Sequence, residues 1–323
     1  MFNRTHFEYG IHASMFSHFA GLRIDPQGFC RSRRSHYTGL KVAKVTDDLK
    51  LPFNTSEGWS ISGIPDGHGI YDVSWSPDGS HLVFTVRPLT VSEASYSPAQ
   101  LWAANAREGQ AYRVVSRGIN SIFHSYSWVD DTTLIAAVVP DEGMAPPYKS
   151  DIPVGPRIED NSEGRESQMR TYQDLLKNSH DVALFEHYSR SQLMIIDLTT
   201  GICSEFLSDP RIYTLVSPSP NGQYVLVSWL QPPWSYALPC GRFPKSTRLF
   251  TRLGNEIRVL AELPLAESIP LGMDACREGP RGISWRDDKP AELSWAECQV
   301  RSIFVLFFRL FLNYCTASKL ILP

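Results

Sequence analysis

The stretch VSWSPDGSHLVFTV, Val73–Val86, decides the fold class. A short strand pattern precedes Asp78-Gly79, and a second, apolar strand pattern follows it. Asp-Gly favours a tight hairpin turn, because these residues tolerate the positive φ angles that such a turn demands. The stretch is therefore predicted to fold as a β-hairpin.

The same pattern recurs three times along the chain. The later copies are Tyr126–Val139, Val216–Trp229 and Ile283–Trp295. Asn221-Gly222 supplies another strong turn, whereas two Asp-Asp pairs occupy the turn in the second and fourth copies. The distance from Trp75 to Trp128 suits one propeller blade of four strands with its loops.

Two further hairpins are predicted outside these copies. Strand patterns flank Arg107-Glu-Gly109 in the first unit and Thr199-Thr200-Gly201 in the second. The predicted fold is therefore all-β, a partial (open) β-propeller of about four blades. An open arc leaves edge strands unpaired and apolar blade faces uncovered, so we expect the isolated chain to aggregate.

A small helical insertion interrupts the repeats within residues 140–190. Pro140–Ser167 is rich in proline, glycine and charge, which predicts an exposed loop. Thr171–Tyr188 has an apolar side and predicts one or two helices, with a break at Asn178-Ser179. For the whole chain we expect an irregular segment over residues 1–18, the propeller with this insertion over 19–299, and an apolar tail over 300–323.

Composition excludes several classes of function. The formal net charge is −3, so nothing favours nucleic acid as a partner. The six cysteines form no C-x-x-C pair and no zinc-like cluster with histidine, which predicts scattered reduced thiols and no metal or cofactor. His180 and His187 are spaced unlike a zinc-binding helix and are expected on a helix surface. Residues 1–20 lack the apolar core of a secretory signal and make a poor transit peptide.

Ten ordered blocks carry a resemblance to a known family. They are Phe19–Asp25, Cys30–Ser35, Tyr37–Gly39, Gly63–Gly67, Val154–Pro156, Arg170–Lys177, Pro239–Lys245, Leu263–Glu267, Ser284–Pro290 and Trp295–Glu297. In these blocks the chain resembles the propeller part of plant-type chloroplast glutamyl endopeptidases, which are serine peptidases of the prolyl-oligopeptidase family. The resemblance implies a propeller that restricts access to a separate α/β-hydrolase domain, cleavage after glutamate and a place in the chloroplast stroma. Without that resemblance, a cytoplasmic location is expected.

The chain departs from the family pattern in its chemistry. It contains no G-x-S-x-G nucleophile elbow, and Gly282-Ile-Ser-Trp-Arg286 has arginine where the last glycine is required. No α/β alternation follows, so no catalytic residue is assigned. The predicted function is the non-catalytic propeller portion of such a peptidase, active in proteolysis and substrate gating. The alternative is a stand-alone propeller that binds peptides or proteins.

Two sets of residues are candidates for binding. Five basic residues could guide acidic peptides, or could be solvated or ion-paired loop residues: Arg31, Arg33, Arg34, Arg242 and Lys245. Four tryptophans on predicted strands could form an aromatic surface, although packing between blades is the favoured interpretation: Trp75, Trp128, Trp285 and Trp295.

The apolar run Ser302–Leu312 in the tail has three interpretations. A membrane anchor is disfavoured because the run is short and Arg309 interrupts it. A terminal strand or helix is the second interpretation. The favoured one is non-native coding sequence, because the resemblance stops at Gln299 and Gln-Val-Arg is what an unspliced donor site can encode. Membrane attachment is therefore not expected, and peptides are the expected partners if a hydrolase domain is joined.

Overall fold

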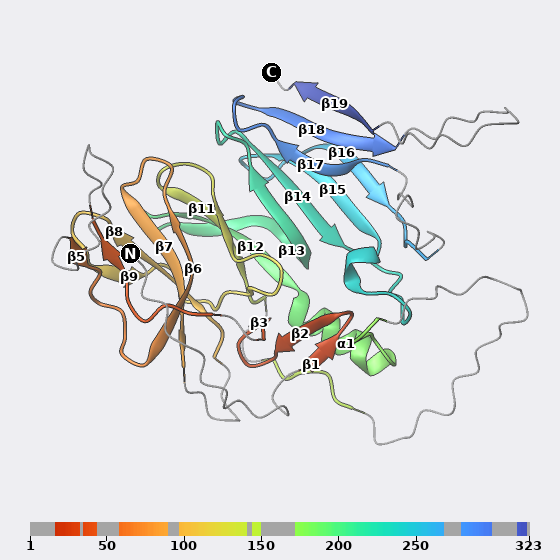
Figure 1. The fold of residues 1–323 in the computed structure, drawn as a ribbon, viewed down its shortest axis with the longest axis horizontal. Helices are drawn as coiled ribbons and strands as arrows, with labels where there is room; N and C mark the ends of the chain where they lie inside the picture. The colour runs from red at the N-terminus through yellow and green to blue at the C-terminus, as the bar shows by residue number, and fades with distance from the viewer. Residues whose placement is uncertain are drawn as a thin grey trace, which may run out of the picture.

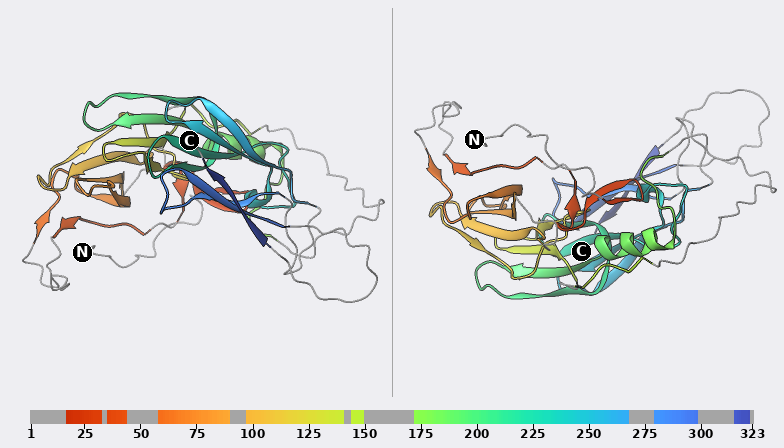
Figure 2. Two further views of the ribbon diagram at one scale, coloured as in Figure 1. Left: turned by 90° about the horizontal axis from the view of Figure 1, so that it is seen from above. Right: turned by 90° about the horizontal axis from the view of Figure 1, so that it is seen from below.

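A computed structural model describes residues 17–32, 35–43, 58–89, 97–140, 144–149, 172–267, 279–298 and 315–321. Within them the regular structure consists mainly of antiparallel strands, arranged as successive sheets along an arc (Figures 1 and 2). The all-β prediction is confirmed. The apolar run Ser302–Leu312 of the tail and most of the inserted loop lie outside the described residues.

Blade 1 is a four-stranded sheet in the order β6-β7-β8-β9. Its strands are β6 (His68–Trp75), β7 (His81–Pro88), β8 (Gln100–Asn105) and β9 (Ala111–Arg113). β6 and β7 form the hairpin predicted around Asp78-Gly79, and β8 and β9 form the hairpin predicted around Arg107-Glu-Gly109. Both predictions are confirmed.

Blades 2 and 3 share one long strand and therefore form one continuous seven-stranded sheet. Its strands are β10 (Tyr126–Trp128), β11 (Thr133–Val138), β12 (Ser191–Asp197), β13 (Cys203–Pro218), β14 (Tyr224–Leu230), β15 (Lys245–Thr251) and β16 (Glu256–Leu263). The first part of β13 pairs with β12 and closes blade 2, whereas the part from Ile212 onward pairs with β14 and opens blade 3. A single strand thus carries the chain from the last position of one blade to the first position of the next.

Blade 4 is a three-stranded sheet of β17 (Arg281–Trp285), β18 (Glu292–Cys298) and β19 (Cys315–Ile321). β17 and β18 form the fourth predicted hairpin. β19 pairs along the whole of β18, so the backbone of the chain's last strand continues this sheet. The count of about four blades is confirmed.

Apolar layers fill the space between successive blades. Val83 and Leu101 of blade 1 share a core with Leu134 of blade 2. A second core joins blades 2 and 3, and a third joins blade 3 to Trp285 and Leu293 of blade 4. Each blade therefore buries one face against the next, which is the packing expected of a propeller arc.

The outer faces of blades 1 and 4, at the two ends of the arc, are not the uncovered apolar surfaces that the sequence predicts. At blade 1, β4 (Lys41–Val42) and β5 (Trp59–Ser60) form a ribbon whose neighbours Leu40 and Ile61 are buried with Phe84. At blade 4, Trp285 and Leu293 face blade 3, so the cross-strand pair Ser284 and Ser294 lies on the opposite face. In the described part of the chain, one end is covered and the other exposes small polar side chains. The expectation of a bare apolar face was therefore wrong at blade 1, and Ser284 and Ser294 are polar positions on the outer face of blade 4.

A small cap lies at the ends of blades 2 and 3. It contains β1 (Ser17–Phe19), β2 (Leu22–Asp25), β3 (Cys30–Arg31), α1 (Ser179–Ser189) and the 3-10 turn η2 (Cys240–Arg242). Phe19, Phe185 and Phe243 meet in its core, and Figure 1 shows α1 beside β1 and β2. The cap ties segments that are far apart in the sequence to one end of the arc.

The inserted helix is shorter than predicted. α1 begins only after Asn178, whose side chain caps the helix by accepting a hydrogen bond from the backbone N–H of Asp181 at 2.9 Å. Tyr172–Lys177 is not helical: Leu176 is buried in the cap core, and the carbonyl of Asp174 accepts from the N–H of Gly21. The predicted break at Asn178-Ser179 is thus the start of the helix, and the residues before it are held by β1 and β2.

Candidate functional site

The turns between the first two strands of blades 1 and 3 have the same pattern of internal hydrogen bonds. In blade 1, Ser76 Oγ donates to Asp78 Oδ1 at 2.6 Å, and in blade 3, Ser219 Oγ donates to Asn221 Oδ1 at 2.8 Å. Hydrogen bonds from Ser76 and Ser80 lower the pKa of Asp78 to about 2. The repeated Ser-Pro-Asp/Asn-Gly sequence therefore builds the same rigid turn twice.

These turn ends converge on a groove, which we call the axial groove. It has a volume of about 470 Å³ and is lined from all four blades by Pro77, Trp128, Val129, Ser217, Pro218, Ser219, Pro220, Ser284, Trp285 and Asp287. Its floor and walls come from equivalent positions of successive repeats. A site built in this way exists only when the blades are assembled.

Two of the predicted tryptophans lock neighbouring blades together at this groove. The indole N–H of Trp128 donates to Ser74 Oγ of blade 1 at 2.9 Å, and that of Trp285 donates to the Ser217 carbonyl of blade 3 at 2.7 Å. Trp295 packs partly buried against the core between blades 3 and 4, and Trp75 is 45% exposed. The structure therefore supports packing for three of the four, and Trp128 and Trp285 also line the groove.

The structure also brings together a serine, a histidine and an aspartate that the sequence analysis missed. Ser127 Oγ lies 3.3 Å from His124 Nε2, and Asp72 of blade 1 accepts a hydrogen bond from Ser125 Oγ at 2.9 Å. However, Ser127 Oγ donates its proton to the carbonyl of Val216 at 2.7 Å. A serine nucleophile must give that proton to a base, so this set does not form an activated serine.

The polar cluster instead joins the first strands of three blades. Asp72 has a positive φ of 49° at a bulge in β6, and its carbonyl accepts from the hydroxyl of Tyr126. Ser127 continues the chain of contacts to blade 3. Burial lowers the pKa of His124 to about 4 despite the nearby charge of Asp72, so His124 is neutral at pH 7. The polar run His124–Ser127, which leads into the second hairpin, is the sequence signal for this contact.

The predicted basic residues are only partly placed. Arg31 Nε donates to the Ile122 carbonyl at 2.8 Å, and the guanidinium lies 6.0 Å from the ring centre of Phe123. Arg31 also lies near Cys240 in the turn that contains Arg242, and its charge opposes the rise of the Cys240 pKa to about 11, which is caused by burial. Lys245 begins β15. Arg33 and Arg34 lie outside the described residues, and guidance of acidic peptides stays a prediction.

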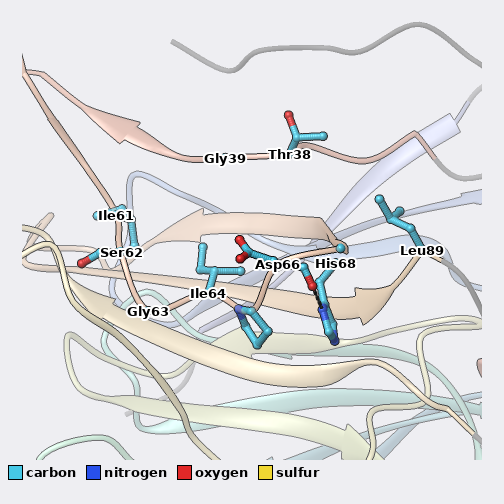
Figure 3. Close-up of a pocket in the computed structure, with 11 residues that line it drawn as sticks. Thr38, Gly39, Ile61, Ser62, Gly63, Ile64, Asp66, His68 and Leu89 are labelled. Atoms are coloured by element: carbon cyan, nitrogen blue, oxygen red, sulfur yellow. Dashed lines mark hydrogen bonds between the residues drawn. The ribbon is translucent and has the colours of Figure 1, made fainter.

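A second, smaller pocket lies at the opposite end of blade 1. It has a volume of about 230 Å³, and Figure 3 shows the Gly63–Gly67 loop around it with Thr38, Gly39 and Leu89. The φ angles of Gly63 and Gly67 are 86° and 71°, which explains glycine at both positions. His68 Nδ1 lies 2.9 Å from the Asp66 carbonyl. The Gly63–Gly67 block thus forms a loop in which backbone conformation explains both glycines.

Few other reactive groups occur in the described part of the chain. Cys30, Cys203 and Cys240 are not disulfide-bonded. Among the described residues, no group of acidic, histidine or cysteine side chains could hold a metal ion. His180 and His187 both lie on α1, where His187 contacts the ring of Tyr188. None of the helices in the described ranges has the length and apolar character needed to cross a bilayer.

Sequence comparison relates most of the chain to two plant proteins. It is 40% identical over 283 residues to the probable glutamyl endopeptidase, chloroplastic, of Oryza sativa subsp. japonica, and 41% identical over 285 residues to the protein of that name from Arabidopsis thaliana. The aligned part covers 87% of this chain but only 29% and 28% of the two relatives. The predicted resemblance is confirmed, and the chain spans less than a third of the length of these relatives.

Structural comparison finds weaker likenesses. An acylaminoacyl peptidase of Pyrococcus horikoshii is 15% identical with a TM-score of 0.40, over 82% of this chain and 34% of that one. A putative TolB from Agrobacterium tumefaciens is 10% identical with a TM-score of 0.34, over 72% of this chain and 64% of that one. No protein-family model matches the chain.

Proposed function

Because 87% of the chain is related to part of the chloroplastic glutamyl endopeptidases, we propose that it acts as the propeller part of such a peptidase. In this role it binds peptides and controls their passage to a catalytic unit that carries the serine, histidine and aspartate. The axial groove carries the proposal, since all four blades contribute to it. We propose that this takes place in the chloroplast, and in its stroma.

The chain itself is proposed to have no peptidase activity. Its sequence contains no nucleophile elbow. Two serine hydroxyls in the described part of the chain lie beside a histidine: that of Ser127 donates to a backbone carbonyl, and that of Ser80, next to His81, donates to the carboxylate of Asp78. The purified chain should therefore bind peptides without cleaving them and should not react with a fluorophosphonate probe.

A chimera tests the gating role. Residues 19–299 of this chain would replace the aligned segment of the Arabidopsis relative, and a matched variant would lack the segment. The chimera is expected to cleave short glutamate-containing peptides and to spare folded proteins, whereas the deletion loses this discrimination. Equal discrimination by both proteins would refute the gating role.

A stand-alone binding module is the second candidate function. The covered face of blade 1 and the polar pair on the outer face of blade 4 favour it, because such ends do not require another blade. This candidate predicts that the isolated chain binds peptides tightly while the chimera is inactive. An active chimera with restored discrimination would instead favour the peptidase role.

A further inference from the structure

The axial groove has an unusual balance of polar groups. Among its ten lining residues, Asp287 is the only charged side chain. Three others are prolines, which have no backbone N–H to donate. The wall therefore offers more hydrogen-bond acceptors than donors, which suits a cation and disfavours a carboxylate.

Asp287 differs from the other carboxylates of the same turns. Asp288 pairs with Arg286 at 2.6 Å, and Asp130 pairs with Arg252 at 2.5 Å. Asp78 is held by the serine hydroxyls of its own turn. Asp287 makes no hydrogen bond or ion pair with the other described side chains, and it is exposed at the groove. Its charge is thus available to a ligand.

The nearby cations do not cancel this charge. Arg252 and Arg286 are both engaged in the ion pairs just described. Lys289 is exposed and does not line the groove, and its charge acts on Asp288.

Aromatic walls complete the chemistry of the groove. Trp128 is half-buried and Trp285 is 8% exposed, and their indole hydrogen bonds hold both rings in place before a ligand arrives. Trp128 therefore offers the larger aromatic surface at the groove. A Lys or Arg side chain can lay its aliphatic part along such rings and present its cation to a carboxylate. We infer that the axial groove binds a Lys or Arg side chain of an extended peptide, with Asp287 as its charge partner.

This inference rests on the proposed peptide-binding function and adds a preference to it. Segments with a basic residue bind in the groove, whereas glutamate is disfavoured there. For a solvent-accessible pair next to aromatic rings, the expected preference for Lys over Gln is about 3- to 10-fold at low ionic strength. The preference should fall as salt is added.

The test uses the full chain and three fluorescent ten-residue peptides that differ only in a central Lys, Gln or Glu. Fluorescence anisotropy gives the dissociation constant of each. We expect Lys to bind most tightly and Glu most weakly. Asp287→Asn should reduce the affinity for the Lys peptide to that for the Gln peptide, and Asp287→Lys should favour the Glu peptide.

Asp288→Asn is the matched control. It removes a carboxylate from the adjacent position without touching the groove lining, so the order of the three peptides should persist. Equal binding of all three peptides by the unmodified chain would overturn the inference and leave the proposed function intact. A Lys preference that survives in Asp287→Asn would also overturn it. Failure of every peptide to bind would refute the proposed function itself.

Discussion

Gly79 and Gly222 occupy the same position in two repeats but have different surroundings. Their φ angles are 72° and 67°, so alanine is strained at either position, by about 1–2 kcal/mol. A Cβ at Gly79 would meet nothing within 4 Å. A Cβ at Gly222 would lie 2.6 Å from the backbone carbonyl oxygen of Val129 in blade 2, so one of the two blades must shift. Such overpacking costs a further ~1–3 kcal/mol.

Gly79→Ala should therefore lower the free energy of unfolding by about 1–2 kcal/mol, and Gly222→Ala by about 2–5 kcal/mol. The difference between them isolates the contact between blades 2 and 3, because the backbone strain is common to both. Urea unfolding followed by circular dichroism measures both values if the m-values agree. Equal losses would refute the argument, since the turn of blade 3 would then not touch blade 2.

Three further predictions concern pH and contacts between segments. Burial lowers the pKa of His124 to about 4 in the folded chain, so the unfolded chain takes up a proton first as the pH falls from about 6.5. The free energy of unfolding should therefore drop by about 3 kcal/mol towards pH 4. His124→Gln should flatten this part of the profile of urea midpoint against pH. Trp285→Phe removes the donor to the Ser217 carbonyl and should cost about 1 kcal/mol in the same assay; an unchanged midpoint would argue against that bond. Arg87→Met leaves Asp25 without its ion-pair partner at 2.5 Å and should cost about 2–4 kcal/mol, whereas no loss would mean that this ion pair contributes nothing to stability.

The hairpins were predictable because local residues specify them. Asp78-Gly79 and Asn221-Gly222 require positive φ angles, and the apolar strands after them are buried between blades. Turn chemistry and strand pattern therefore agree with the tertiary packing. The same holds for the outer hairpin at Gly201, where the φ angle is 69°.

The contacts between distant segments were not predictable from local pattern. Leu40 and Ile61 cover blade 1. The segments that carry them are short and make isolated bridges to different strands, so their sequences show no clear hydrophobic periodicity. The hydrogen bond from Arg31 to the Ile122 carbonyl joins residues about ninety positions apart, which no local pattern indicates. The axial groove was also not predictable from local pattern, because residues of several repeats line it and no single repeat contains it.

Tyr172–Lys177 shows a competing local signal. Its apolar residues suit a helix, but the Asn178 cap starts the helix later, and Leu176 is buried in the cap core. A tertiary contact thus overrides the helical pattern there.

The most direct test of the account is hydrogen–deuterium exchange of the chain with and without a saturating basic peptide, with the peptide's mass recorded in the same samples. The account predicts that the peptide stays intact and that protection appears at the groove, in Pro77–Gly79, Trp128–Asp131, Ser217–Gly222 and Ser284–Asp288. Protection confined to outer strands such as β9 or β16, or cleavage of the peptide by the chain, would contradict it.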